Sequence, residues 1–320
     1  MRKNKIYVKL RGRIGNQLFI YALARAIQLQ SEEKRTIILD DSEVLELGWE
    51  NSLTYYNLSD IEFVHSSELL RTSEFFMLRL LAKLYRTITK KMDYMKKYHF
   101  EKHFRKIFQS FGYIVCENGY LPYKIKKSGN ILVDGYFQSE TYFHKYAAQI
   151  KKDFSLKAEL INADYSDYEK IKQRNSICIS IKVEHNVGSE LYDVCTKQYW
   201  KSAIEYMKDK VENPLFFLCS DNVEYVKENL ICCEDMDVIF QEKSYSVPIA
   251  LEIMSSCKHF IIGNTTFGWW AQYLSDYEKK VVVAPSSWML VDMPIHIYQD
   301  GWILIDGNGK RSEKSTGNHA

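Results

Sequence analysis

The feature that most constrains the fold is a regular alternation of strand-like and helix-like segments in the second half of the 320-residue chain. Short apolar runs of strand length are separated by stretches whose apolar residues recur at helical spacing. The predicted strands span residues 176–183, 214–220, 236–241, 259–263, 280–284 and 302–305. The predicted helices span residues 197–211, 222–230, 248–257 and 266–275. This alternation indicates an α/β fold with a parallel, doubly wound sheet.

The first half opens with the same pattern. Residues 5–10 and the RTIILD run at 35–40 predict two strands, and between them Gly12 and Gly15 form a tight loop that leads into a helix. Such a β-α-β unit binds ligands beyond the carboxyl ends of its strands. The glycine spacing is GxxG rather than GxGxxG, so it does not predict a dinucleotide site. A purely structural role explains this segment equally well, with the two glycines forming the loop and Asn16 capping the helix.

Residues 71–109 form a strongly basic segment. It has eleven Lys and Arg residues and three acidic ones, a local charge of +8 in a chain whose net charge is +2. Its spacing predicts an amphipathic helix with Arg79, Lys83 and Arg86 on the polar face. Such a helix can lie on an anionic membrane surface, or it can simply pack on its own domain. The predicted apolar face consists of Phe75, Phe76, Leu78, Leu81, Ala82 and Tyr85.

The remaining segments set the expected domain boundaries. Residues 113–117 and 130–133 predict two more strands of the first domain, whereas residues 41–70 give no clear assignment. We expect an N-terminal Rossmann-like domain over residues 1–153, with the basic segment as an insertion. A polar linker is expected over 154–175, a C-terminal domain over 176–306, and a disordered polar tail over 307–320.

The composition indicates a cytoplasmic protein. The seven cysteines lack metal-ligand spacing and indicate reduced thiols. The first ten residues contain no apolar stretch of signal-peptide length, and no segment approaches about 20 apolar residues. We therefore expect a protein that is cytoplasmic, either free or peripheral on the inner membrane face, and no nucleic-acid partner.

The stretch HFIIGNTTFGWWAQYL at residues 259–274 joins a predicted buried strand to an aromatic-rich helix. Asn264, Thr265 and Thr266 stand at the junction, where their side chains can accept hydrogen bonds from the first-turn N–H groups. Those N–H groups and the helix dipole can instead bind an anion such as a phosphate. A capped core helix with two packing tryptophans is the alternative interpretation.

Five separated blocks resemble bacterial α-1,2-fucosyltransferases, the family 11 inverting glycosyltransferases. They are RGRIGNQLFIYALARA, GYFQSETYF, YWKSAIEYM, FFLCSDNVEYVKENL and MSSCKHFIIGNTTFGWWAQYLS, in the order of the family. The resemblance implies two facing Rossmann-like domains, the GT-B arrangement, with a metal-independent nucleotide-sugar site in the cleft and no further cofactor. It also implies GDP-fucose as the default donor and a galactoside hydroxyl, in an oligosaccharide or lipid-linked glycan, as the acceptor.

The same resemblance implies the donor-binding residues. Thr265 and Thr266 match the part of the family form NSTFSWW that is expected at the donor diphosphate, and Asp221 matches the first acid of the family's SDD. The GxxG loop is expected to face the same cleft from the other domain. The implied donor-binding residues are Gly12, Gly15, Asn16, Gln17, Asp221, Asn264, Thr265, Thr266 and Phe267.

The chain departs from the family after the first strand of the second domain. The family motif there is HxRRxDY, whereas this chain has Lys182, Glu184, His185 and Val187 at the His, Arg, Arg and Asp positions. The arginines expected to grip a diphosphate bidentately are absent, and Lys182 can replace them only as a point charge. Asn222 also replaces the second acid of SDD.

The expected chemistry needs a base for the acceptor hydroxyl and charge stabilisation for the departing diphosphate. Lys182 and the helix start after Asn264 are the candidates for the second task. The acidic run at 234–237 superficially matches a DxD metal motif, but it begins a new strand and we expect no metal there. The candidate bases lie on the loop after residue 183 and are Glu184, His185, Glu190 and Asp193.

Three functional hypotheses follow. The first is a fucosyltransferase, the second is a glycosyltransferase of the same fold with another nucleotide-sugar donor, and the third is a non-catalytic glycan-binding or partner module. Measurements of nucleotide binding and of sugar transfer distinguish the three hypotheses.

Overall fold

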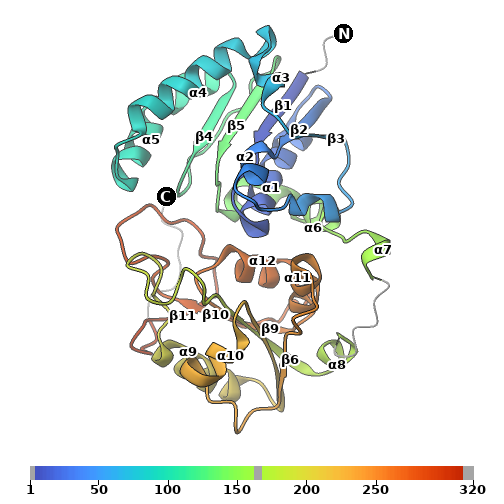
Figure 1. Ribbon diagram of the computed structural model, residues 1–320, viewed down its shortest axis with the longest axis vertical. Coiled ribbons are helices and arrows are strands. Elements are labelled where there is room, and N and C mark those ends of the chain that lie inside the picture. The colour runs from blue at the N-terminus through green and yellow to red at the C-terminus, as the bar shows by residue number, and fades with distance from the viewer. Residues whose placement is uncertain (1–3, 162–167, 313–320) are drawn as a thin grey trace. The chain divides into compact units, whose positions relative to one another are not determined.

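The computed structural model describes residues 4–161 and 168–312 (Figure 1). The chain divides into two compact units, which are described separately. Unit 1 comprises Met1–Lys157 and Asp292–Ile297, and unit 2 comprises Ala158–Val291 and Tyr298–Ala320.

Unit 1 is built on a parallel five-stranded sheet in the order β3-β2-β1-β5-β4. Its strands are β1 (Asn4–Lys9), β2 (Arg35–Asp40), β3 (Ile61–Val64), β4 (Tyr113–Cys116) and β5 (Ile131–Gly135). The chain runs to one edge through β2 and β3 and then crosses to β4 at the other edge, so β1 and β5 flank the point where the winding reverses. The sequence did not predict β3, which is a short edge strand with Glu62 exposed.

Helices cover both faces of this sheet. They are α1 (Ile14–Gln30), α2 (Ser42–Glu46), α3 (Glu68–Arg71), α4 (Phe76–Thr89), α5 (Tyr94–Ser110) and α6 (Ala147–Asp153), with short turns η1 (Ser52–Tyr55), η2 (Ser73–Phe75), η3 (Glu140–Tyr142) and η4 (His144–Tyr146). Tyr7, Ile38 and Leu132 of the sheet share one core cluster with residues of α4 and α5. The neighbouring strand residues point to the opposite face, because side chains alternate along a strand.

The basic segment folds as two helices rather than one. Asp93 ends the break between α4 and α5, and its side chain accepts a hydrogen bond from the Lys96 N–H at 2.8 Å. One face of α4 packs on unit 1 through Leu78, Ala82 and Tyr85. The sequence prediction wrongly placed Phe76 on that face, because it is exposed.

A buried ionic cluster lies where β1 and β5 end. Arg11, just beyond β1, pairs with the fully buried Asp134 of β5 at 2.7 Å, and Arg86 of α4 reaches the other oxygen of the same carboxylate at 3.2 Å. Tyr113 donates a hydrogen bond to that carboxylate at 3.1 Å. Burial alone would raise the pKa of Asp134, but Arg11, Arg86 and Lys9 outweigh burial and hold that pKa at about 2.

A second buried carboxyl, Glu101 of α5, has the opposite shift. Burial raises its pKa to about 7, although a hydrogen bond from Tyr85 opposes the shift. Because the folded-state pKa lies above the unfolded value of about 4.3, this group favours folding at low pH and loses that contribution as the pH rises from about 4 to 7.

We therefore predict that Glu101→Gln becomes progressively stabilising as the pH rises. Its free energy of unfolding relative to the wild type should increase by about 2 kcal/mol between pH 5 and pH 8. Urea unfolding at both pH values measures this, and Glu62→Gln is the control because that carboxyl is exposed on β3. A difference that stays constant with pH would contradict the assignment.

Unit 2 contains a parallel six-stranded sheet in the order β11-β10-β9-β6-β7-β8. Its strands are β6 (Asn175–Ile181), β7 (Pro214–Ser220), β8 (Val238–Phe240), β9 (His259–Ile262), β10 (Val282–Pro285) and β11 (Ile303–Ile305). β6, β7 and β8 wind to one edge and β9, β10 and β11 to the other. The predicted parallel, doubly wound α/β fold is thus confirmed, and the winding reverses between β6 and β9.

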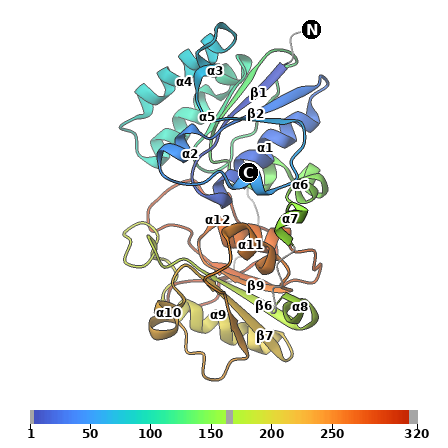
Figure 2. The same ribbon diagram turned by 45° about the vertical axis from the view of Figure 1, so that its right-hand side comes forward.

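The helices of unit 2 are α7 (Ala158–Ile161), α8 (Tyr168–Gln173), α9 (Lys197–Lys210), α10 (Val223–Tyr225), α11 (Val247–Ser255) and α12 (Thr266–Leu274), with one π-helical turn, η5 (Val226–Leu230). α9 packs on one face of the sheet through Tyr199, Trp200 and Met207. α8 lies beside β6 (Figure 2), and its Ile171 is fully buried.

Several predicted boundaries differ from the structure. Residues 158–161 and 168–175 of the predicted linker belong to unit 2, and Asp292–Ile297 of the predicted C-terminal domain belong to unit 1. Phe154 and Leu156, at the start of the predicted polar linker, are buried, and Leu156 forms a β-bridge with Tyr56, so these residues pack in unit 1. Residues 307–312 are also ordered, because the Ser312 N–H donates to Leu304 and the Asp306 N–H donates to Lys310. The rest of the predicted tail, residues 313–320, lies outside the described residues. All seven cysteines are unbridged.

The helices in the described parts of the chain are too short or too polar to cross a lipid bilayer.

Candidate functional site

The reversal between β6 and β9 places their carboxyl ends side by side. Ser180 pairs with Ile262, and the Gly263 N–H donates to the Ser180 carbonyl at 3.0 Å. Ligands of doubly wound sheets bind beyond the strand ends at such a reversal. Two segments follow the strands here, the loop at 182–196 and the start of α12.

The first turn of α12 offers backbone N–H groups to a ligand. The Thr265 side chain caps the helix, as predicted, by accepting a hydrogen bond from the Gly268 N–H at 3.1 Å. The N–H groups of Thr266 and Phe267 donate to no acceptor among the described residues, and both side chains are half-buried. Free N–H groups together with the helix dipole form a local anion-binding arrangement.

Gly268 allows α12 to approach the sheet closely. A Cβ atom at this position would lie 2.9 Å from the Ser180 hydroxyl and 3.2 Å from the Ile262 side chain. The lack of a Cβ atom therefore lets the helix start lie directly against the ends of β6 and β9.

Asn264 holds the surrounding loops together. Its side-chain NH₂ donates to the carbonyls of Tyr192 and Trp288, each at 3.0 Å, and its side-chain oxygen accepts from Asn186 at 3.0 Å. The residue is buried and its amide is fully used by these bonds. Asn264 thus positions the loops rather than presenting its side chain to a ligand.

Lys182 and Asp221 form an ion pair at the ends of β6 and β7. The Asp221 carboxylate also accepts hydrogen bonds from the backbone N–H groups of Val183, at 2.8 Å, and Glu184, at 3.2 Å. These contacts close the turn after β6 and give Asp221 a structural task. Lys182 keeps a partly exposed ammonium, which Glu184 also approaches at 3.7 Å.

The four predicted base candidates all lie on this loop, but their surroundings differ. Asp193 is engaged as an acceptor, because the Gly188 N–H donates to it at 2.8 Å. His185 is exposed with a left-handed backbone angle of φ +67°, and Glu190 is also exposed. Glu184 is exposed and lies beside Lys182, 3.7 Å from its ammonium group.

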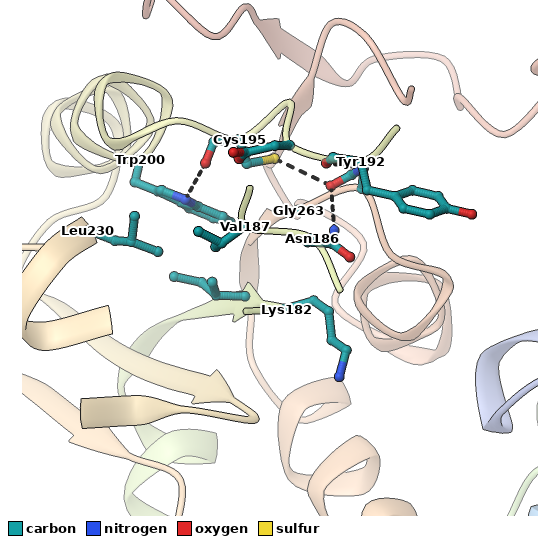
Figure 3. Close-up of a pocket in the computed structure, with 11 residues that line it drawn as sticks. Lys182, Asn186, Val187, Tyr192, Cys195, Trp200, Leu230 and Gly263 are labelled. Atoms are coloured by element: carbon teal, nitrogen blue, oxygen red, sulfur yellow. Dashed lines mark hydrogen bonds between the residues drawn. The ribbon is translucent and has the colours of Figure 1, made fainter. Parts of the chain in front are cut away.

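A small pocket within unit 2 lies beside these residues (Figure 3). Its walls include Trp200 and Leu230, which the sequence did not suggest, together with Val187 and Cys195. Trp200 donates its ring N–H to the Cys195 carbonyl at 3.0 Å. Burial raises the pKa of the Cys195 thiol to about 12, so this thiol stays protonated near neutral pH and acts as a wall residue.

The predicted site residues of the first loop belong to unit 1. Gly12 has φ +66°, and a Cβ there would lie 2.3 Å from the Asn16 amide, so the turn requires glycine. Gly15 lies in the first turn of α1, not in the predicted loop, and Asn16 accepts from Gln138 at 2.9 Å instead of capping the helix. Gln17 is fully buried and binds backbone groups of Gly12, Glu50 and Ser52.

The acidic run at 234–237 does not form a cluster. Asp237 pairs with Arg174 at 2.9 Å on the surface. Over residues 4–161 and 168–312, no group of three or more His, Cys, Asp or Glu side chains is arranged to hold a metal ion.

Comparisons with known proteins agree with this fold. Residues 5–306 match the family model described as Glycosyl transferase family 11. The chain is 26% identical over 290 residues to an α-1,2-colitosyltransferase of Escherichia coli, which covers 88% of this chain and 92% of that protein. It is 24% identical over 321 residues to the O-antigen biosynthesis glycosyltransferase WbnK of Escherichia coli, covering 94% of this chain and 100% of the relative.

Solved structures show the same fold. The fucosyltransferase NodZ from Bradyrhizobium superposes with a TM-score of 0.56 at 13% identity, over 92% of this chain and 100% of that chain. A NodZ structure soaked with GDP-fucose gives a TM-score of 0.54 over the same shares.

Proposed function

The chain belongs to glycosyl transferase family 11 and is a glycosyltransferase of the GT-B fold, and we propose that it transfers a sugar from a GDP-linked donor to a glycan hydroxyl. L-Fucose from GDP-fucose, moved to a galactoside in α-1,2 linkage, is the default reaction. The observation that carries the proposal is the open helix start of α12 at the reversal between β6 and β9, within a sequence that matches the family over residues 5–306.

The donor diphosphate is proposed to bind at the N–H groups of Thr266 and Phe267. These groups have no acceptor among the described residues, and the helix dipole adds positive potential at the same point. Lys182, at the end of the neighbouring strand, supplies a positive charge that its ion pair with Asp221 partly neutralises. NodZ, which has the same fold, has been soaked with GDP-fucose, and this supports a guanine nucleotide as the first ligand to test.

The proposed transfer is inverting and independent of metal. The acceptor oxygen attacks the anomeric carbon while a base removes its proton, and the bond to the diphosphate breaks with the negative charge moving onto the phosphate oxygens. Glu184, His185 and Glu190 are the proposed bases, because Asp193 already accepts a backbone hydrogen bond. The start of α12 stabilises the departing charge.

A second donor class is supported by one observation. The two motif arginines are absent, and the lysine that stands in their segment is paired with Asp221. A site with fewer charges holds the diphosphate differently, and the E. coli α-1,2-colitosyltransferase illustrates a relative named for a sugar other than fucose.

The acceptor is proposed to be an oligosaccharide or a lipid-linked glycan. The protein is proposed to act in the cytoplasm or peripherally on the inner membrane face, with membrane contact through residues 71–109.

We predict that GDP raises the melting temperature of the protein more than UDP, CDP or ADP does. A ligand present at 100 times its Kd stabilises the folded state by about 2.7 kcal/mol, which is readily visible in a thermal-shift assay. GDP-fucose and GDP-colitose then identify the sugar. A larger shift with UDP or CDP would indicate a donor linked to that nucleotide instead of GDP. If none of the four nucleotides raises the melting temperature, the proposed function is wrong.

A further inference from the structure

Helix α4 has apolar residues on two faces, of which unit 1 buries only one. Leu78, Ala82 and Tyr85 pack into the core. At about 100° per residue, the other apolar residues fall within an arc of about 120° on the outward face. This outward stripe, each member of which is between 43% and 53% exposed, consists of Phe76, Met77, Leu80, Leu84 and Ile88.

Unpaired positive charge borders the outward stripe. α4 contains no Asp or Glu. Lys83, Lys90 and Lys91 are exposed and have no ion-pair partner in the described part of the chain, and the Arg79 guanidinium lies 5.7 Å from the Phe76 ring centre. Arg86 differs, because its guanidinium is turned inward to Asp134.

A contiguous stripe of exposed apolar side chains marks an interaction surface. The charge around the stripe identifies its partner, because exposed lysines without carboxylate partners match a dense layer of anionic headgroups. A helix with an apolar stripe and a basic flank lies in the plane of a membrane interface, with the stripe at the boundary between headgroups and acyl chains. We infer that the outward stripe of α4 docks unit 1 onto an anionic lipid bilayer.

This inference deepens the membrane contact proposed above and assigns it to one face of one helix. Leucine and phenylalanine side chains enter the interface, while Lys83, Lys90 and Lys91 contact the headgroups. Because the helix lies on the membrane surface and part of its binding is electrostatic, high salt can release the protein. It also brings the enzyme to the surface where a lipid-linked acceptor would present its glycan.

Co-sedimentation of the full chain with vesicles tests the inference. The wild type should bind vesicles that contain phosphatidylglycerol and phosphatidylcholine, and should bind pure phosphatidylcholine at least tenfold more weakly. Raising the salt from 0.1 M to 0.5 M should release it, because screening shortens the reach of the lysine charges. Leu80→Glu/Leu84→Glu and Lys83→Glu/Lys90→Glu/Lys91→Glu should each lower the partition coefficient at least tenfold.

Control variants carry substitutions of the same types elsewhere on the protein. Leu29→Glu alters a partly exposed leucine on α1, and Lys201→Glu/Lys243→Glu reverses two exposed lysines in unit 2. Both should bind vesicles like the wild type. If the leucine variant has a lowered melting temperature, the lysine variant decides the result alone, because its residues are exposed.

Three outcomes overturn the inference. They are absence of binding to anionic vesicles, binding that survives both α4 variants, and self-association of the wild type that the leucine variant abolishes, which would assign the stripe to a second copy of the chain. GDP-induced thermal shifts of the α4 variants keep the two proposals separate. An α4 variant that no longer binds vesicles but still shows the GDP-induced thermal shift supports docking through α4. If neither the wild type nor any variant shows the GDP-induced shift, the proposed function is contradicted, not the docking surface.

Discussion

Thr266→Glu should weaken donor binding strongly without destabilising the protein. The new carboxylate lies in the first turn of α12, where an acidic side chain interacts favourably with the helix dipole, so the melting temperature of the free enzyme should be unchanged or slightly raised. The same carboxylate occupies the positive region proposed for the diphosphate and repels it. Two like charges near a protein surface interact by about 4 kcal/mol at 4 Å, so we expect the Kd for GDP to rise about 100-fold or more.

Two variants control this experiment. Thr266→Gln has a side chain of similar size to Glu without the charge, and it should weaken GDP binding only several-fold. Gln198→Glu places an acid in the first turn of α9, also in unit 2, and should leave GDP binding unchanged. Isothermal titration measures all three, and unchanged GDP binding by a folded Thr266→Glu protein would show that the diphosphate binds elsewhere.

Among the substitutions considered, Asp134→Ala should cause the largest loss of folding stability. The carboxylate is buried between Arg11 and Arg86 and also accepts from Tyr113, so its removal leaves the inward guanidinium of Arg11 with only Glu117 and Glu43. Breaking a buried ion pair by removing one partner costs about 3–5 kcal/mol. Urea unfolding at pH 7 measures the loss, and Lys34→Ala, which breaks an exposed pair with Asp60, should cost less than about 1 kcal/mol.

The pH dependence provides an independent check of Asp134. Its pKa of about 2 lies below the unfolded value of about 3.9, so its contribution is complete above pH 5 and is lost as the pH falls towards 2. The stability difference between wild type and Asp134→Asn should therefore shrink by about 2 kcal/mol over that range. A difference that does not change with pH would place the carboxylate outside the ionic cluster.

The buried strands were predictable because their residues are apolar on both faces and end at polar residues. The predicted bounds of β2 and β7 match the structure residue for residue. β3 was missed because Glu62 interrupts a four-residue edge strand, which leaves too short a pattern to detect. The two apolar faces of α4 also misled the prediction, since spacing alone does not reveal which face the sheet covers.

The candidate site was predictable in its location but not in the tasks of individual side chains. The capping role of Thr265 follows from residue type and position, and the structure confirms it. Asn264 and Gln17 have side chains suited to ligand binding, yet both direct all their polar atoms to neighbouring backbone and side-chain groups. The hydrogen-bond partners of Asn264 are 24 to 78 residues away from it in the chain, so only the folded structure identifies them.

The central claim is that this chain transfers a sugar from a GDP-linked donor although its arginine pair is absent. The most direct test incubates the wild type with GDP-fucose or GDP-colitose and an oligosaccharide that ends in a β-galactoside, and follows the product by mass spectrometry. We predict a product heavier by one donor sugar, formed by the wild type and by Thr266→Gln but not by Thr266→Glu. Binding of GDP without transfer or hydrolysis of either donor would contradict the claim.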